Sequence, residues 1–461
     1  MSRKRVSTVL MIGAVLCGVS MPAVAQTGAS PEVAGLQAEI DALKTEVSQM
    51  RQASSDTWLD ERRAEEVKGL IREVLADAET RASLLQDGAV AGHNGEHFFL
   101  GSADGNNSLE VNGQIQIRGI WDLQDNRGDE DDAGIQIRRA KLGFSGNVIT
   151  PKLQYLIGLS VGNLGLGGDL GVVVVEDVIV GYQLADGLTI KAGKFKLPFL
   201  RDELTSSGRQ QAVERASVTE FFTVDRSEQI QLAYSTDNYQ LVGSLNDGAN
   251  EDFSTAGSDP VEIGLTGRAD VRVAGDWAQK TDYTAWSGED FAAFLGAAIH
   301  YQAGDSRNAD NGSESQADYV GWTIDGSVEN NGLNLYGALM GGHTEYDTTA
   351  LATQDRDMYG YLVQAGYNID DSLEPFIRWE QIDQDVAGQE EPGIITFGVN
   401  YFLSGHNAKW TTDVVWVYDG DVPTANEFGG NGFGTGMGIS NFASATNDEL
   451  VVVRTQFQLL F

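Results

Sequence analysis

The chain ends in the octet RTQFQLLF, residues 454–461, in which apolar and polar side chains alternate up to a terminal phenylalanine. Chain ends are normally polar and frayed, so an apolar end of this kind needs a place in a larger structure. Successive side chains of a strand point to opposite faces. The alternation places on one face Phe457, Leu459 and Phe461, and on the other Arg454, Gln456 and Gln458. We therefore expect the octet to be a strand with one apolar and one polar face.

The same period of two residues runs through the chain from residue 109 onward. It is clear in SLEVNGQIQIRGIW, residues 108–121, and in GIITFGVNYFL, residues 393–403. The pattern predicts an all-β domain over residues 109–461 with about sixteen strands. Their expected ranges are 110–121, 135–146, 152–161, 172–185, 187–195, 228–235, 238–246, 260–273, 292–302, 316–328, 332–343, 357–368, 373–383, 393–403, 408–418 and 449–461.

The connections between these strands alternate in length. Tight turns such as NVITP, ADG and ENNG are followed by long loops such as residues 196–227 and 419–448. Short turns at one end and long loops at the other are typical of a bacterial outer-membrane barrel. The stretch 274–291 departs from this pattern, because its place in the order requires a tight turn.

The N-terminal residues predict export. Residues 1–25 contain a basic start, an apolar run and the small-residue triplet Ala-Val-Ala, and we expect them to be a signal peptide. The single cysteine, Cys17, lies in this segment, so disulfides and thiolate metal sites are excluded from the mature chain. After residue 25 no apolar run reaches the roughly 18 residues that a membrane-spanning helix needs. If the protein crosses a membrane, strands must do it.

Residues 26–87 carry a helical period. Leu36, Ile40, Leu43, Val47 and Met50 are spaced alternately by four and three residues, and a second series runs from 67 to 85. We expect a coiled coil in the periplasm that helps an oligomer assemble; the alternative is one amphipathic helix on the chain's own surface. Residues 88–108 are rich in Gly, Asn and Ser, which predicts a linker.

A transmembrane barrel and a soluble β-sandwich are the two folds that fit the alternation. The export signal, the aromatic residues at strand ends and the terminal phenylalanine favour the membrane. Backbone groups cannot stay unpaired in hydrocarbon, so the last strand must pair with the first, and RTQFQLLF becomes the closing strand. A barrel of this size leaves an aqueous channel. We therefore expect passive diffusion of small polar solutes across the outer membrane of a Gram-negative-type bacterium, with the N-terminal segment in the periplasm.

Charge is distributed unevenly along the predicted barrel. Residues 111–226 hold thirteen Lys and Arg against fifteen acids, whereas residues 227–461 hold eight against thirty-six. Strand alternation and the third long loop provide candidate pore-lining cations, which are Arg118, Arg139, Lys141, Lys152, Lys191, Lys194, Lys196, Arg201 and Arg454. Rings of Lys and Arg at a constriction favour anions, and Arg holds phosphate oxygens bidentately.

A structural role for these bases is the alternative to selectivity. They would then pair with acids and hold the loop in place, the expected partners being Asp177, Glu203, Glu214 and Asp225. The net charge of −36 also repels approaching anions. The sign of ion selectivity therefore stays open, and a general or cation-preferring porin is the alternative to an anion porin.

The segment KAGKFKLPFLRDELTSSGRQQAVERASVTEFF, residues 191–222, resembles the phosphate-selective porins O and P, as does IQIRRAKLGFSGNV, residues 135–148. The matching positions are Gly193, Phe195, Lys196, Pro198, Phe199, Glu203, Thr205 to Ser207, Glu214 to Ser217, Arg138, Arg139 and Gly146. The resemblance implies a sixteen-stranded trimeric barrel whose third loop folds inward, with a phosphate path. Path residues carried over by position are Arg139, Lys141, Lys194, Lys196 and Arg201. The resemblance also implies that Phe457, Leu459 and Phe461 form the signal read by barrel-assembly machinery.

Other chemistry finds little support. Five scattered histidines form no Ser/His/Asp pattern, so we expect no enzyme, and we expect no metal or cofactor. The acidic balance argues against nucleic acid. The run DNRGDEDD, residues 125–132, is either a solvated loop or a site for divalent cations that bridge outer-membrane lipopolysaccharide. A coiled coil that tethers the barrel to the cell envelope is a further role that is compatible with a pore.

Overall fold

The computed structural model describes residues 89–94, 97–123, 132–161, 173–249, 261–304, 317–346, 355–385, 390–420 and 450–461, together with positions 42, 44 and 45, which are helical. The predicted signal peptide and the rest of the predicted coiled coil lie outside these residues. The chain divides into two compact units, 1–84 and 85–461. Within the described residues, no helix combines the length and the apolar character needed to span a membrane.

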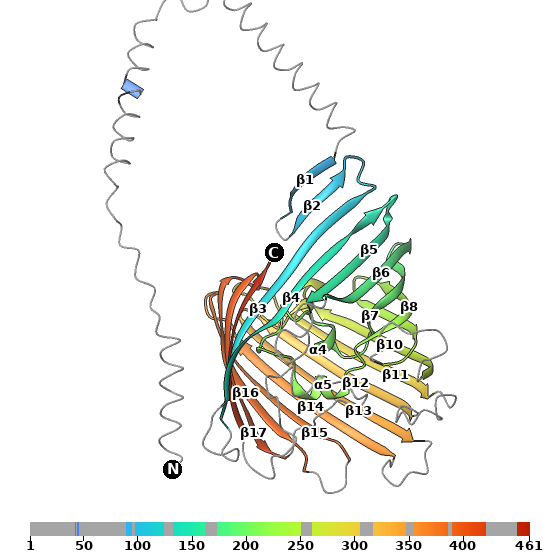
Figure 1. The fold of residues 1–461 in the computed structure, drawn as a ribbon, viewed down its shortest axis with the longest axis vertical. Helices are drawn as coiled ribbons and strands as arrows, with labels where there is room; N and C mark the ends of the chain where they lie inside the picture. The colour runs from blue at the N-terminus through green and yellow to red at the C-terminus, as the bar shows by residue number, and fades with distance from the viewer. Residues whose placement is uncertain are drawn as a thin grey trace, which may run out of the picture. The chain divides into compact units, whose positions relative to one another are not determined.

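The second unit is an antiparallel sheet closed on itself (Figure 1). Its wall consists of β3 (Ser108–Leu123), β4 (Asp132–Val148), β5 (Thr150–Val161), β6 (Val173–Ala185), β7 (Leu188–Lys196), β8 (Arg226–Ser235), β9 (Tyr239–Asn246), β10 (Val261–Ala274), β11 (Ala292–Gly304), β12 (Ala317–Asn330), β13 (Leu333–Tyr346), β14 (Arg356–Tyr367), β15 (Leu373–Asp383), β16 (Gly393–Ser404), β17 (Ala408–Asp419) and β18 (Leu450–Leu460).

The sixteen predicted strands are all present. Their ends differ from the predicted ends by three residues or fewer, as at the start of β4 (132 against 135) and the end of β13 (346 against 343). The last strand, β18, pairs antiparallel with the first, β3, over Leu123↔Val451 to Gln114↔Leu460. This pairing closes the barrel and confirms the prediction made from the terminal octet.

The two faces of each strand have the predicted character. On β3, Ile115 and Ile117 are exposed on the outside, whereas Gln116 and Arg118 between them are almost completely buried. On β18, Arg454 and Gln458 are buried, and Leu459 is exposed. The barrel therefore has an apolar outer surface, suited to lipid, and a polar inner surface.

The predicted linker contains a short hairpin. It consists of β1 (Ala89–His93) and β2 (Phe98–Ser102). The second of these strands pairs with the first residues of β3, from Phe98↔Val111 to Gly101↔Ser108. Since β18 pairs with β3 only from Gln114 onward, the hairpin continues the sheet beyond the end of the closing strand.

Two segments between strands contain buried residues. The first is the loop of residues 197–225, which carries α4 (Arg201–Leu204) and α5 (Ser217–Phe222) and lies inside the ring of strands (Figure 1). The second is residues 275–291, which carry the 3-10 helix η1 (Trp277–Thr281) and have Tyr283 and Ala285 buried. The stretch 274–291, which breaks the turn pattern, thus enters the interior at residues 282–285. We call the two segments the inner loop and the inward turn.

Candidate functional site

The inner loop is held inside the barrel by its own apolar side chains. Leu197, Phe199 and Phe222 are buried in one cluster with Met340 and Met358 of β13 and β14. Burying side chains of this size stabilises each by about 1.5–3 kcal/mol relative to exposure. Burial of these apolar side chains therefore stabilises the inward-folded conformation of the loop and fixes the loop inside the lumen.

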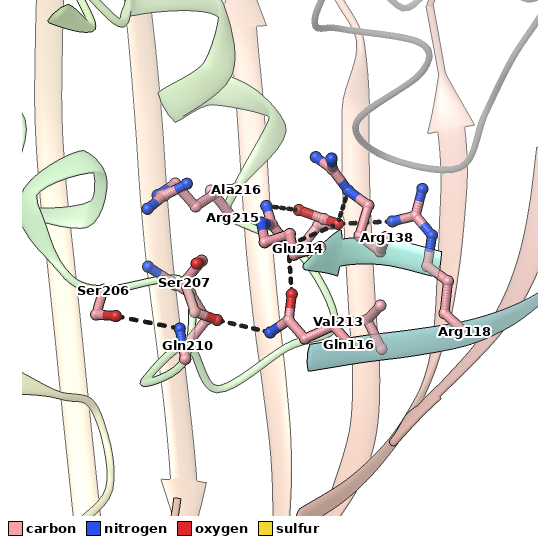
Figure 2. A network of polar contacts seen from close by, with 12 residues as sticks. Gln116, Arg118, Arg138, Ser206, Ser207, Gln210, Val213, Glu214, Arg215 and Ala216 are labelled. Atoms are coloured by element: carbon pink, nitrogen blue, oxygen red, sulfur yellow. Dashed lines mark hydrogen bonds and ion pairs between the residues drawn. The ribbon is translucent and has the colours of Figure 1, made fainter. Parts of the chain in front are cut away.

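One carboxylate joins the loop to the opposite wall. Glu214 Oε1 accepts hydrogen bonds from Nη1 of Arg118 on β3 at 2.6 Å and from Nε of Arg138 on β4 at 2.5 Å. Its Oε2 accepts one from Nη2 of Arg139 at 2.8 Å. Figure 2 shows Arg118 and Arg138 facing Glu214 from neighbouring strands. The side chain of Glu214 is only 4% exposed, so the three guanidinium groups compensate a buried charge.

A β-bulge explains why both consecutive arginines reach Glu214. Gln116 of β3 pairs with Arg139 and the next residue, Ile117, pairs with Ile137, which leaves Arg138 as the extra residue of β4. A bulge places two residues opposite one and redirects their side chains. Strict alternation directs Arg138 outward, and for this reason the sequence does not identify it as an inward-facing residue.

The rest of the loop is fixed to the strands that follow it in the chain. The backbone N–H of Val213 donates to Asp413 Oδ2 on β17 at 2.9 Å, and that of Val218 donates to Glu380 Oε2 on β15 at 3.1 Å. Gln458 of β18 donates to the carbonyl of Gly208 at 2.7 Å. Buried side chains of the wall thus satisfy the backbone of the loop, as a segment without regular structure requires.

A cavity of about 950 Å³ remains between the loop and the inner face of β3 to β8. Its lining reaches from Phe461 at the end where the turns are short to Val161 and Val174 at the end where the loops are long. The charged lining residues are eight bases, Arg138, Arg139, Lys141, Lys191, Lys196, Arg209, Arg215 and Arg226, and five acids, Glu176, Asp177, Glu203, Glu220 and Asp225. The cavity therefore has a formal surplus of three positive charges, and we call it the basic cavity.

The structure divides the predicted pore-lining cations into two groups. Four of the nine line the basic cavity, namely Arg139, Lys141, Lys191 and Lys196. The other five do not, namely Arg118, Lys152, Lys194, Arg201 and Arg454.

Each of these five has a different position. Arg118 is bound to Glu214 as described. Arg454 is fully buried and donates from Nη2 to Asp413 Oδ2 at 2.7 Å. Arg201 is buried in the inner loop with its guanidinium 5.3 Å from the ring centroid of Tyr336. Lys194 is buried in β7, and Lys152 is exposed at the start of β5, outside the lining of the basic cavity.

The ion pairs expected from a structural role of the bases are also present. Lys196 Nζ lies 2.8 Å from Glu203 Oε1, and Arg226 Nε lies 2.9 Å from Asp177 Oδ1. Lys141 pairs in the same way with Glu176 at 2.6 Å. Of the three lysines that line the basic cavity, Lys191 makes no ion pair among the described residues. The bases thus fix the loop and at the same time leave positive charge in the cavity.

The acids of the inner loop fall into two electrostatic classes. Burial opposes ionisation of Glu203 and Glu214, but the arginine and lysine charges around them hold the pKa of both carboxyl groups below its usual range. Burial and the neighbouring charge of Glu203 raise the pKa of Glu220 to about 7. Glu220 lines the basic cavity, so one acid of the lining changes its charge near neutral pH.

Metal binding has no candidate site in the described part of the chain. No group of three or more His, Cys, Asp or Glu side chains is arranged there to hold an ion.

The closed barrel, the inward-folded third loop and the polar cavity along the barrel are the features of one class of protein, the outer-membrane porin channels. The chain belongs to the phosphate-selective porin O and P family, whose model matches residues 109–429. This confirms the resemblance stated from the sequence. Membership of the family and the fold place the protein in the outer membrane and make it a channel.

Solved structures show the same fold at low sequence identity. An anion-selective porin from Comamonas acidovorans is 15% identical with a TM-score of 0.52, covering 77% of this chain and all of that one. The outer-membrane channel DcaP of Acinetobacter baumannii is 12% identical with a TM-score of 0.52, covering 78% and 99%. OmpF of Salmonella typhi, solved with daunomycin, is 14% identical with a TM-score of 0.52, covering 77% and 99%.

A relative by sequence comes from Aquifex aeolicus (strain VF5) and is described as an uncharacterized protein. It is 25% identical over 275 aligned residues, and the match covers 53% of this chain and 63% of that protein. The match thus spans less than two thirds of the relative's length.

Proposed function

We propose that this porin conducts small anions by passive diffusion and that phosphate is the preferred solute. The observation that carries the proposal is the basic cavity, where eight bases face five acids. An excess of Lys and Arg along a narrow aqueous path favours anions. Guanidinium groups match phosphate oxygens in geometry, and five of the eight lining bases are arginines.

The proposal extends to partners. We infer a homotrimer with its apolar outer surface in outer-membrane lipid and lipopolysaccharide, assembled by barrel-assembly machinery that recognises Phe457, Leu459 and Phe461. The N-terminal segment would then lie in the periplasm and either support the trimer or tether the barrel to the cell envelope. The shared fold and the family support these inferences without testing them.

A general or cation-preferring pore is the second candidate. It is favoured by the ion pairs of Lys141, Lys196 and Arg226, which cancel part of the positive charge of the cavity. The inner faces of β10 to β17 also carry more acids than bases. The two candidates differ in what passes the narrowest point, and conductance measurements distinguish them.

Inhibition by phosphate tests the proposal at the level of the solute. Single channels of the purified full-length protein are recorded in chloride, and inorganic phosphate is added at rising concentration. A phosphate-preferring path predicts a saturable decrease of chloride current, because a tightly held anion occupies the cavity. An equal concentration of sulfate serves as the control for anion charge. Chloride current that phosphate leaves unchanged would reject phosphate as the preferred solute.

A further inference from the structure

The inward turn reaches across the end of the barrel where the other turns are short. It leaves β10 and returns to β11, yet it also contacts three distant turns. The backbone N–H of Gly288 donates to Asn331 Oδ1 at 2.9 Å, and that of Ser287 donates to Asp371 Oδ1 at 2.7 Å. Asp282 Oδ2 lies 3.2 Å from Nε2 of His406. The inward turn is therefore bound to the three short turns that connect the strands from β12 to β17.

The same turn meets the inner loop inside the barrel. Gln211 Nε2 donates to the carbonyl of Tyr283 at 3.3 Å, and Arg209 Nη1 donates to Thr281 Oγ1 at 2.8 Å. The ring of Tyr283 packs at 4.8 Å on that of Tyr336 of β13. Tyr283 is 1% exposed. The loop and the turn thus contact each other on this side of the lumen, where Tyr283 is the buried side chain of the turn that packs on the wall.

The wall behind this layer is acidic. The charged residues buried on the inner faces of β10 to β17 are six acids, Asp270, Asp325, Glu329, Glu374, Glu380 and Asp413, and three bases, Arg268, Arg378 and Lys409. Glu329 Oε2 has no hydrogen-bond partner among the described residues. An open path along this wall would attract cations, since acidic rings select them.

We propose that the inward turn determines ion specificity by sealing the acidic side of the lumen, which leaves the basic cavity as the conducting path. The inference rests on the proposed anion selectivity and adds to it the segment that makes such selectivity possible in a chain with net charge −36. The loop covers the acidic wall at mid-height, and the turn covers it at the end of the barrel. The conducting path then runs along the half in which bases outnumber acids, while the half in which acids outnumber bases is covered.

A shortened variant tests this role. Residues 276–291 are replaced by Asn-Gly, which joins Gly275 to Ala292 and continues the register set by Ala274↔Ala293. Two-residue Asn-Gly loops are well suited to antiparallel hairpins. Planar-bilayer recordings in a salt gradient should show a higher single-channel conductance and a reversal potential shifted toward the cation. Ser287→Ala is the matched control, because only the backbone of Ser287 makes the contact, and it should leave both quantities unchanged.

The outcomes separate this inference from the proposed function. If the shortened variant folds and both conductance and reversal potential stay as in the wild type, the inward turn seals nothing and the inference is wrong. If the wild type itself prefers cations, the proposed anion function fails, while the role of the turn is still decided by whether shortening raises conductance. Should the shortened variant fail to fold, Tyr283→Ala provides the test, since it removes the ring that packs on Tyr336 and should shift both quantities in the same direction.

Discussion

Phe461 and Gly113 exchange two backbone hydrogen bonds, of 2.7 Å from the N–H of Gly113 and 3.1 Å from the N–H of Phe461. A Cβ on residue 113 would stand 2.3 Å from Cζ of the Phe461 ring, so only glycine allows the terminal ring to lie there. This contact completes the closing seam between β18 and β3. The aromatic chain end thus has a defined partner in the first strand of the barrel.

Substitution at this seam should weaken the closed barrel. Gly113→Ala should lower the temperature at which the barrel loses its resistance to SDS, because the Phe461 ring must leave its place. Gly113→Ala combined with Phe461→Ala should recover part of the loss, since the clash disappears. Electrophoretic mobility of heated and unheated samples measures this. If the double variant is weaker than Gly113→Ala by the full effect of Phe461→Ala, the two residues are not coupled at the seam.

The terminal residue also permits a test of assembly. If barrel-assembly machinery recognises the chain end, Phe461→Ala should reduce the amount of folded protein in the outer membrane more than it reduces refolding of purified protein in detergent. Leu373→Ala, which removes an exposed apolar side chain elsewhere on the outer surface, is the matched control. Equal losses in cells and in detergent would assign Phe461 to barrel stability alone.

Removal of the carboxylate of Glu214 should loosen the inner loop. Glu214→Gln leaves Arg118, Arg138 and Arg139 without their shared counter-charge, and loss of one partner from a buried ion pair costs roughly 3–5 kcal/mol. We expect larger fluctuations of single-channel current and faster proteolysis within residues 197–225. Glu228→Gln, in β8, is the control for loss of one acid. If the current fluctuations and the rate of proteolysis stay as in the wild type, the apolar contacts of the loop suffice to hold it in place.

The pair of Arg454 and Asp413 predicts a loss of stability without a change in the basic cavity. Both side chains are fully buried, so Arg454→Met leaves the Asp413 charge without its guanidinium and should lower the free energy of unfolding by about 3–5 kcal/mol. Adding Asp413→Asn to Arg454→Met should restore part of the lost free energy of unfolding. Urea unfolding in detergent measures the change, and an unaltered midpoint for Arg454→Met would exclude the pair as a stabilising contact.

Lys191 should contribute directly to anion preference. It lines the basic cavity and makes no ion pair among the described residues, so Lys191→Gln removes charge without releasing a carboxylate. We expect a reversal potential closer to zero. Lys152→Gln is the matched control, because Lys152 is an exposed lysine that does not line the cavity, and its removal should change the reversal potential less. Equal effects of the two substitutions would mean that general surface charge, and not the cavity, determines selectivity.

The pH dependence of selectivity follows from Glu220. Burial and the charge of Glu203 raise the pKa of Glu220 to about 7; the charge of Glu214 adds to this shift, while Arg215 and Arg138 oppose it. Below this pH the group is neutral, and above it the lining gains a negative charge. Anion preference should therefore fall as the pH rises through 7. Glu220→Gln should remove this pH-dependent change and keep the anion preference at the level that the wild type shows below pH 7. A step of unchanged size in the variant would assign the titration to another group.

The fold could be predicted from the sequence because its signals are local. Alternation in RTQFQLLF and the regular change between short and long connections depend only on neighbouring residues, and they located every strand of the barrel. The partners of the inner loop could not be predicted in this way. Glu214 and Arg139 are 75 residues apart, and Val213 and Asp413 are 200 apart, so no local pattern relates them.

Local alternation also predicted part of the candidate site. Alternation correctly directed Arg139, Lys141 and Lys191 inward, but it does not distinguish a side chain in open solution from one buried against the loop, such as Arg454. Arg138 depends on a bulge, and the role of Tyr283 depends on where the inward turn packs. Both are properties of the assembled barrel.

The reversal potential of the wild-type channel in a potassium chloride gradient tests the central claim most directly. The full-length protein is inserted into a planar bilayer of neutral lipid, and the zero-current voltage is read at neutral pH. The surplus of bases in the basic cavity predicts a potential with the sign of chloride selectivity. A potential with the sign of potassium selectivity would contradict the account.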